Sequence, residues 1–356
     1  MPEANVRVIT GTNSITALGH DGDMTASSFF SGTAMISFDE RRVDEYGNPI
    51  KTAVITGFEG QNPGDDEPAF MAAVTAKCLS DLCERYFEEG KKVERLFLFL
   101  GYPSKHRPGP GFEGDEDTWV TSLENILEPY ADHVYYKYFK TGNTSALHGI
   151  EKAVDILAKH DDAVCLVGGV DSLLSAETLS WFDQDIRLVS ETPKRDHGLF
   201  PSQAAGFFIL ETLKGAAKRK KLPLAVLVSH SITQEPAPFV SEHPSKGDGL
   251  TLAIREALEA KRISPESINT IFCDLNGEHH KFRDWGFAGI RCFPGSDHSP
   301  DLFNPADCMG DVGAAWVPVL TGLASEGFKR DVVGEHVMIF CSDDHGERAA
   351  LVLRKG

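Results

Sequence analysis

The sequence predicts an α/β protein built from two similar halves, each with a mostly parallel sheet covered by helices. Two observations indicate this fold class. Short apolar segments of strand length alternate with longer segments in which apolar residues recur at helical spacing. The same order of helix, strand, polar excursion, small-residue turn, helix and strand also occurs twice along the chain. Such a repeat indicates a duplicated half, in which helical crossovers connect parallel strands.

The first copy of the repeat begins with a helical pattern over residues 69–89, which leads into the apolar strand 95–101. A small-residue turn at Gly142 then opens a helix that is expected to reach residue 157. The apolar run 163–167 predicts the strand behind it.

The second copy follows the same plan. A helical pattern over 249–261 precedes the strand 269–277, and a turn at Gly310 opens a helix to residue 323. The strand 337–341 lies behind that helix. The matching order predicts that the second half folds like the first.

The two halves are expected to span residues 1–214 and 222–356 and to be fused as one globular unit. The short stretch between them carries the one dense basic run of the sequence, which consists of Lys218, Arg219, Lys220 and Lys221. A charge run usually marks a solvated helix end, and this is the favoured interpretation. The alternative is a docking point for an acidic partner.

The composition excludes several classes of protein. Lys and Arg number 35 against 53 Asp and Glu, so a net charge of −18 argues against nucleic-acid and anionic-membrane partners. No apolar run approaches the ~18 residues of a membrane span, and the first residues lack a secretion signal. The 7 Cys form no CxxC pair and fit reduced core thiols. A cytoplasmic protein is expected.

No metal or cofactor site is expected. His279 and His280 with Asp284 form one cluster of potential ligands, and residues 343–345 form another. Neither has a familiar ligand spacing, so solvated loop residues are the favoured interpretation. The segment 11–14 lacks the glycine and lysine pattern of a phosphate-binding loop.

Motifs in collinear order over nearly the whole chain resemble those of β-ketoacyl-acyl-carrier-protein synthases in the thiolase superfamily. Val6 to Gly19 resembles their first strand and turn, and Asn143 to Ile150 resembles their nucleophile elbow. Further segments that resemble the family are Val167 to Asp171, Arg195 to Glu211, Ile263 to Ile268 and Cys308 to Ala315. The resemblance implies a thiolase-like, five-layer αβαβα duplication with mostly parallel sheets.

The chain departs from this family at the positions of its catalytic residues. Asn143 stands where the family has its nucleophilic Cys, and Asn has no ionisable sulfur. The two family His residues, which donate hydrogen bonds to the thioester oxygen, map to Leu275 and Asp311. The family Lys maps to Ala306. Leu275 cannot donate and an ionised Asp311 would repel negative charge, so the resemblance implies a protein that is not an enzyme.

A vestigial pocket is expected around Asn143. Its other members by resemblance are Thr144, Leu199, Phe200 and Cys308. Leu199 replaces the usual gatekeeper Phe, and Phe200 follows it. Cys308 is conceivable as a migrated nucleophile, but a small buried thiol is favoured because no His stands at a defined partner position.

Three functions remain open. The leading hypothesis is a pseudoenzyme that acts as a scaffold, chaperone or adaptor, and resemblance suggests effector loading in type VI secretion as one setting. The second is a non-catalytic subunit of a heterodimeric ketosynthase, similar to a chain-length factor. The third is an acyl-transferring enzyme that uses other residues.

A protein partner is expected, either a second copy of this chain or a thiolase-fold sister chain. The apolar segment Ala163 to Val170 is expected to be the edge strand that the partner covers.

Overall fold

The structure is a computed structural model that describes residues 6–58, 67–109, 116–193, 195–294 and 299–356. Its main sheet has 10 strands in two groups of five, which the antiparallel pairing of β1 with β8 joins. The first group, in sheet order, is β5 (Ala131–Phe139), β4 (Val93–Gly101), β6 (Val164–Ser172), β7 (Gln203–Thr212) and β1 (Arg7–Ile15). The second is β10 (Asp301–Phe303), β9 (Ile268–Cys273), β11 (His336–Ser342), β12 (Glu347–Lys355) and β8 (Ala225–Gln234).

The two groups have the same topology. When the strands of each group are numbered by their order in the chain, both groups read 3-2-4-5-1 from the outer edge inward. In each, four strands run in one direction, and one, β7 or β12, runs against its two neighbours. The predicted duplication with mostly parallel strands is therefore confirmed.

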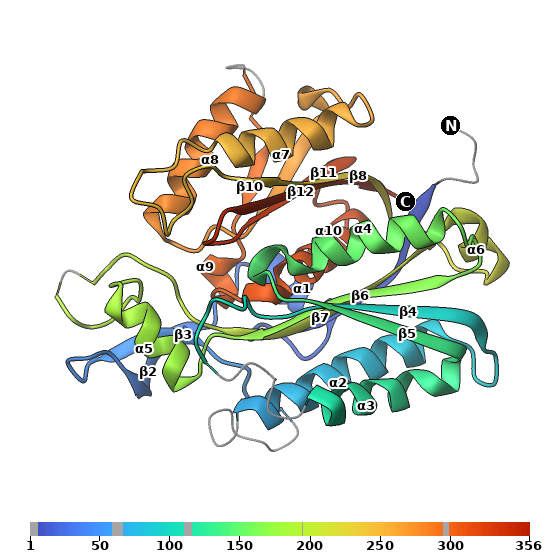
Figure 1. Cartoon of the computed structure of the whole chain (residues 1–356), viewed down its shortest axis with the longest axis horizontal. Helices are drawn as coiled ribbons and strands as arrows, with labels where there is room; N and C mark the ends of the chain where they lie inside the picture. The colour runs from blue at the N-terminus through green and yellow to red at the C-terminus, as the bar shows by residue number, and fades with distance from the viewer. Residues whose placement is uncertain (1–5, 59–66, 110–115, 194, 295–298) are drawn as a thin grey trace.

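The helices form three layers around the two groups of strands (Figure 1). Helices α2 (Glu67–Tyr86) and α3 (Glu116–Leu127) cover the outer face of the first group. Helices α7 (Asp248–Glu259) and α8 (His279–Cys292) cover the outer face of the second. The central layer holds α1 (Gly22–Phe30), α4 (Ser145–Leu157), α9 (Ala306–Met309) and α10 (Trp316–Lys329). The five-layer αβαβα arrangement matches the fold class that the sequence predicts.

Smaller elements complete the chain. The hairpin β2 (Ile36–Val43) and β3 (Pro49–Ala53) lies beside α5 (Ala176–Gln184), and α6 (Leu213–Lys218) follows β7. The 3₁₀ turns are η3 (Glu128–Tyr130), η4 (Gly142–Thr144), η5 (Pro265–Ser267) and η6 (Gly313–Ala315). None of the helices in the described part of the chain is long and apolar enough to cross a membrane.

The composition of each helix explains its layer. In α10 every residue except Lys329 is buried, as a helix between two sheets requires, and its first half is rich in Val and Leu. In α7 the buried residues recur on one face, which packs on β8 and β12, and the other face is exposed. The largest apolar cluster joins α4 and α10 to both groups of strands, so the central layer holds the halves together.

The structure corrects the expected edge strand. The segment Ala163 to Val170 lies largely in β6, which is buried along its whole length between β4 and β7. The outermost strands of the described sheet are instead β5 and β10. The apolar character of β6 reflects burial on both faces, which continuous apolar runs also indicate. The division into 1–214 and 222–356 falls around α6 and stays a prediction.

Candidate functional site

The site lies where the starts of the two central helices, α4 and α10, meet the ends of β9 and β11. Asn143 sits in the turn η4, immediately before α4. Gly142 precedes it with a φ of +63°, and a Cβ at this position would lie 2.8 Å from Oδ2 of Asp343. Glycine therefore lets the turn bring Asn143 close to the second half of the chain.

The amide of Asn143 is bound to a buried ion pair. Its Nδ2 donates to Oδ2 of Asp274 at 2.8 Å, and the same oxygen accepts from Nζ of Lys281 at 2.7 Å and from the backbone N–H of Ser342 at 2.9 Å. Burial alone would lower the pKa of Lys281, but the charges of Asp274 and Asp311 more than offset it and raise that pKa. The ammonium group is therefore firmly charged and paired.

Asp311, which the resemblance expects at the position of the second family His, accepts hydrogen bonds on both carboxylate oxygens. Its Oδ1 accepts from Nε1 of Trp316 at 2.7 Å and from the backbone N–H of Gly313 at 2.9 Å. Its Oδ2 accepts from Nδ2 of Asn276 at 2.6 Å. In each of these three hydrogen bonds Asp311 is the acceptor. A substrate oxygen with negative charge would therefore find no hydrogen-bond donor in this side chain.

Leu275 does not face this site. It is only 2% exposed and packs in the apolar cluster between α7, α8 and the second group of strands. The next residue, Asn276, lines the cavity instead and contacts Asp311. Ala306 is also fully buried, in the central apolar cluster. The sequence analysis thus missed Asn276, which the Asn276-Gly277 step could have indicated, because Asn followed by Gly is typical of a turn.

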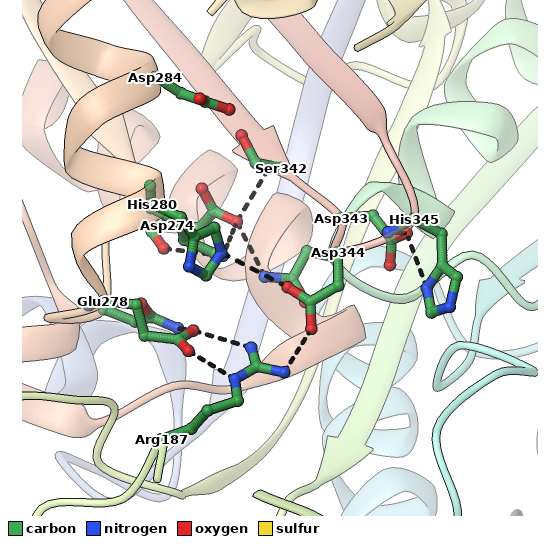
Figure 2. Close-up of polar contacts among 12 residues, drawn as sticks. Arg187, Asp274, Glu278, His280, Asp284, Ser342, Asp343, Asp344 and His345 are labelled. Atoms are coloured by element: carbon green, nitrogen blue, oxygen red, sulfur yellow. Dashed lines mark hydrogen bonds and ion pairs between the residues drawn. The ribbon is translucent and has the colours of Figure 1, made fainter. Parts of the chain in front are cut away.

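A second ion-pair cluster lies beside the first (Figure 2). The guanidinium of Arg187 donates from Nε and Nη2 to the two oxygens of Glu278 at 2.6 and 3.0 Å, and its Nη1 lies 2.8 Å from Oδ2 of Asp344. The ring of Phe239 stacks against it, with its centroid 4.5 Å from the guanidinium carbon. Burial favours the neutral form of Asp344, but Arg187 outweighs it and holds that pKa well below its usual range.

This cluster also contains a potential metal-ligand set. Glu278, His280 and Asp344 place one ligand atom each within 4.8 Å of one another. Arg187 nevertheless binds both carboxylates, so a fixed cation already neutralises them. One residue in each of the two clusters of potential ligands is buried, where the sequence predicted solvated loop residues. Asp284 is 1% exposed and pairs with Arg348, and Asp343 is 9% exposed.

The space left between these groups is small. The cavity measures about 40 Å³, and among its lining residues are Asn143, Leu199, Asn276, Arg187 and Lys281. Small-molecule sites usually enclose roughly 300–1,000 Å³, and a single water takes about 30 Å³. The cavity therefore has room for a water molecule and not for an acyl chain.

Comparison with known proteins supports the fold. No protein-family model matches the sequence, and no curated protein matches it significantly. A ketosynthase from module 6 of the bacillaene synthase of Bacillus subtilis aligns over 99% of this chain and 72% of its own, at 14% identity and a TM-score of 0.80. The fold is that of the ketosynthases.

Two further structures align over the full length. One is the ishigamide ketosynthase/chain length factor, which covers 99% of both chains at 16% identity with a TM-score of 0.78. The other is a type II polyketide acyl-carrier protein in complex with its ketosynthase, for which 99% of this chain and 100% of that chain align at 13% identity with a TM-score of 0.78. At these identities the ketosynthase likeness concerns the fold alone.

Of the five residues expected in the vestigial pocket, Asn143 and Leu199 line the cavity of this ketosynthase-like fold. Thr144 is buried next to it, and its hydroxyl donates to Glu347 at 2.7 Å. Phe200 and Cys308 are absent from the lining. Burial, followed by the charge of Asp307, raises the pKa of the Cys308 thiol, which disfavours the reactive thiolate.

The basic run is only partly a surface feature. Arg219 pairs with the fully buried Glu211, and its Nε also donates to the hydroxyl of Tyr86 at 3.2 Å. The ammonium of Lys221 lies 4.8 Å from the centre of the Tyr86 ring. Lys218 and Lys220 are exposed. Arg219 neutralises a buried carboxylate, so Lys218 and Lys220 are the exposed cations of this run, and docking of an acidic partner there stays a prediction.

Asp343 gives the fold a pH dependence. Its burial, followed by the charge of Asp344, raises its pKa to about 7. The folded state thus keeps a proton that the unfolded chain loses near pH 4, and stability declines as pH rises towards and through 7. We expect Asp343→Asn to reduce the loss of unfolding free energy between pH 6 and pH 8 by about 1 kcal/mol.

Urea denaturation of both proteins at pH 6 and pH 8 measures this difference directly. Comparison at each pH cancels the contributions of titrating groups that do not contact Asp343, such as His148, whereas His345 lies 3.7 Å from this carboxylate and belongs to the measured effect. Equal pH dependence in the two proteins would show that Asp343 is ionised throughout this range.

Proposed function

We propose that this protein is a catalytically inactive, ketosynthase-like subunit that works by binding another protein. The observation that carries the proposal is the state of Asn143, whose amide is tied to the Asp274–Lys281 ion pair in a cavity of about 40 Å³. An acyl-transfer site needs a nucleophile, donors for the developing oxyanion and space for the acyl group. The residues at this centre favour none of the three.

The charge arrangement argues in the same direction. Asp311 takes the place of a hydrogen-bond donor and is held as an acceptor by Trp316 and Asn276. Lys281, which shares Oδ2 of Asp274 with Asn143, is committed to that carboxylate. A thioester oxygen that gained negative charge here would meet carboxylates, and the nearby hydrogen-bond donors are already bound to those carboxylates. This arrangement would raise the activation barrier of acyl transfer instead of lowering it.

The favoured binding mode is pairing with a second thiolase-fold chain through β5. This strand is outermost in the first group, and its Tyr135 and Tyr136 are 48% and 46% exposed. An open edge with aromatic side chains offers unpaired backbone groups to another strand. Among the neighbours in fold, the ishigamide structure is named as a ketosynthase/chain length factor, which favours a subunit of that kind here. The type VI secretion setting has no specific observation in its favour.

Two measurements test this function, one of acylation and one of oligomeric state. The purified protein is incubated with malonyl and long-chain acyl thioesters and examined by intact-mass spectrometry. We expect no acyl adduct on the native chain and little or none on Asn143→Cys, because that thiol would lack both space and a general base. A stable adduct on the native protein, for example at Cys308, would contradict the proposal.

Light scattering at micromolar concentration supplies the second readout. We expect a dimer of this chain or a complex with a ketosynthase encoded beside it, and dissociation when Tyr135 and Tyr136 are both changed to Lys. Leu222→Lys is the control for adding Lys at an exposed apolar position, because that side chain is 82% exposed and lies between α6 and β8, outside β5. A native protein that stays monomeric with and without such a ketosynthase would refute pairing.

A further inference from the structure

A second, larger cavity lies at the other end of α4 from Asn143. It measures about 610 Å³ and opens between the starts of β1 and β8, the last turns of α4 and the connection from α7 to β9. Val154, which lines it, is eleven residues after Asn143, so roughly 16 Å of helix separates the two places. Its volume falls within the range of small-molecule sites.

The floor of this cavity is aliphatic. Its apolar lining consists of Val6, Val154, Val226, Leu227, Val228, Ala260 and Ile263, and no Phe, Tyr or Trp is among the lining residues. Branched aliphatic walls without aromatic faces suit a flexible hydrocarbon chain better than a planar ring, which aromatic side chains would stack. The chemistry of these lining residues thus favours an alkyl group.

The charged part of the lining is entirely basic. Arg7, Lys261, Arg262 and Arg354 line the cavity with no Asp or Glu, in a chain whose net charge is −18. Among the described residues, no carboxylate forms an ion pair with Lys261, Arg262 or Arg354. Most other cations near cavities of this protein are paired, as Arg187 and Lys281 are.

The two histidines of the lining do not supply this charge. Burial lowers the pKa of His230 and, with a smaller contribution from Arg354, that of His336. Glu151 and Asp155 act in the opposite sense on His230, as Glu335 does on His336, without overcoming burial. The positive potential at neutral pH therefore comes from the Arg and Lys side chains.

We propose that this cavity binds an amphiphilic anion, with an alkyl chain on the Val and Ile floor and an anionic head group at Lys261, Arg262 and Arg354. The proposal goes beyond the inactive-subunit function and does not depend on it, because the cavity shares no lining residue with the site around Asn143. Binding would bury an alkyl chain and give three solvent-exposed cations an anionic partner.

Isothermal titration calorimetry on the full chain tests the proposal with dodecanoate and dodecyl phosphate below their micellar concentrations. Dodecyltrimethylammonium is the probe with the same chain and the opposite charge. We expect one saturable site for at least one of the anions, and at least tenfold weaker binding of the ammonium compound. Preference between the anions identifies a carboxylate or a phosphate head group. Absence of binding by both anions, or equal binding of the ammonium compound, would overturn the proposal.

Two variants locate the site. Lys261→Glu with Arg354→Glu should weaken anion binding at least tenfold, and Val226→Phe should weaken it by filling the floor. Lys92→Glu with Lys246→Glu is the control of equal charge change, because both side chains are exposed and lie outside this cavity. Circular dichroism checks that each variant is folded. Equal loss of affinity in the control pair would show that net charge, and not this cavity, determines binding.

Discussion

Replacing Lys281 with Met is expected to lower the free energy of unfolding by about 3–5 kcal/mol, because it leaves the buried carboxylate of Asp274 without its counter-charge. Both side chains are almost fully buried, at 3% and 0% exposed, and their charged atoms lie 2.7 Å apart. After the change, Oδ2 of Asp274 would keep only the neutral donors of Asn143 and Ser342. Met fills a similar volume, so the loss reports charge more than packing.

Chemical denaturation followed by circular dichroism measures this loss. The double variant Lys281→Met with Asp274→Asn should recover part of it, because the buried position then carries no charge. Lys214→Met is the matched control: its ion pair with Asp161 is short, at 2.6 Å, but the two side chains are 64% and 50% exposed. Such surface pairs contribute little. Equal destabilisation by Lys281→Met and Lys214→Met would mean that the buried pair is not ionised.

Gly169→Ala is expected to destabilise the protein by about 3 kcal/mol or more, because the added methyl group collides with backbone. Gly169 lies in β6, and a Cβ there would come within 2.2 Å of the carbonyl oxygen of Ala314 and 3.2 Å of Cα of Ala315. No side-chain rotation relieves these contacts. The turn η6 and the start of α10 would have to move away from the sheet.

Gly286→Ala supplies the matched control for this glycine. Gly286 is exposed in α8, and no atom lies within 4 Å of a Cβ built there. Ala favours helix over Gly by up to about 1 kcal/mol, so this variant should be equal to or more stable than the native chain. Thermal and chemical denaturation of both variants decide the matter, and a Gly169→Ala protein as stable as Gly286→Ala would show that η6 yields easily.

The fold class could be predicted because its signals are local. Helical spacing and short apolar runs depend on residues within one element, and the repeated order of elements indicates the duplication. Small residues also marked the turns before Asn143 and Gly313, where the starts of the two central helices meet the site. Boundaries shifted by a few residues: the strand expected over 269–277 ends at Cys273, and the following residues leave the sheet.

The candidate site could be predicted only in part. The absence of a Cys at position 143 is a property of the sequence alone, and so is an Asp at position 311. What surrounds them is not, because Asp274 is 131 residues from Asn143, and Arg187 is 91 residues from Glu278. No spacing rule indicates that such residues will be partners. Their pairing arises when the ends of β9 and β11 meet the start of α4.

The sequence by itself determined the α/β class, the two-fold repeat and the presence of Asn, not Cys, at position 143. Only the tertiary structure decided that β6 is central and β5 is at the edge, because sheet order depends on hydrogen bonds between distant segments. It also decided that Asn276, and not Leu275, faces Asp311. Both residues lie beyond the end of β9, where no strand alternation fixes the side that a residue faces, so the packing of the folded chain decides it.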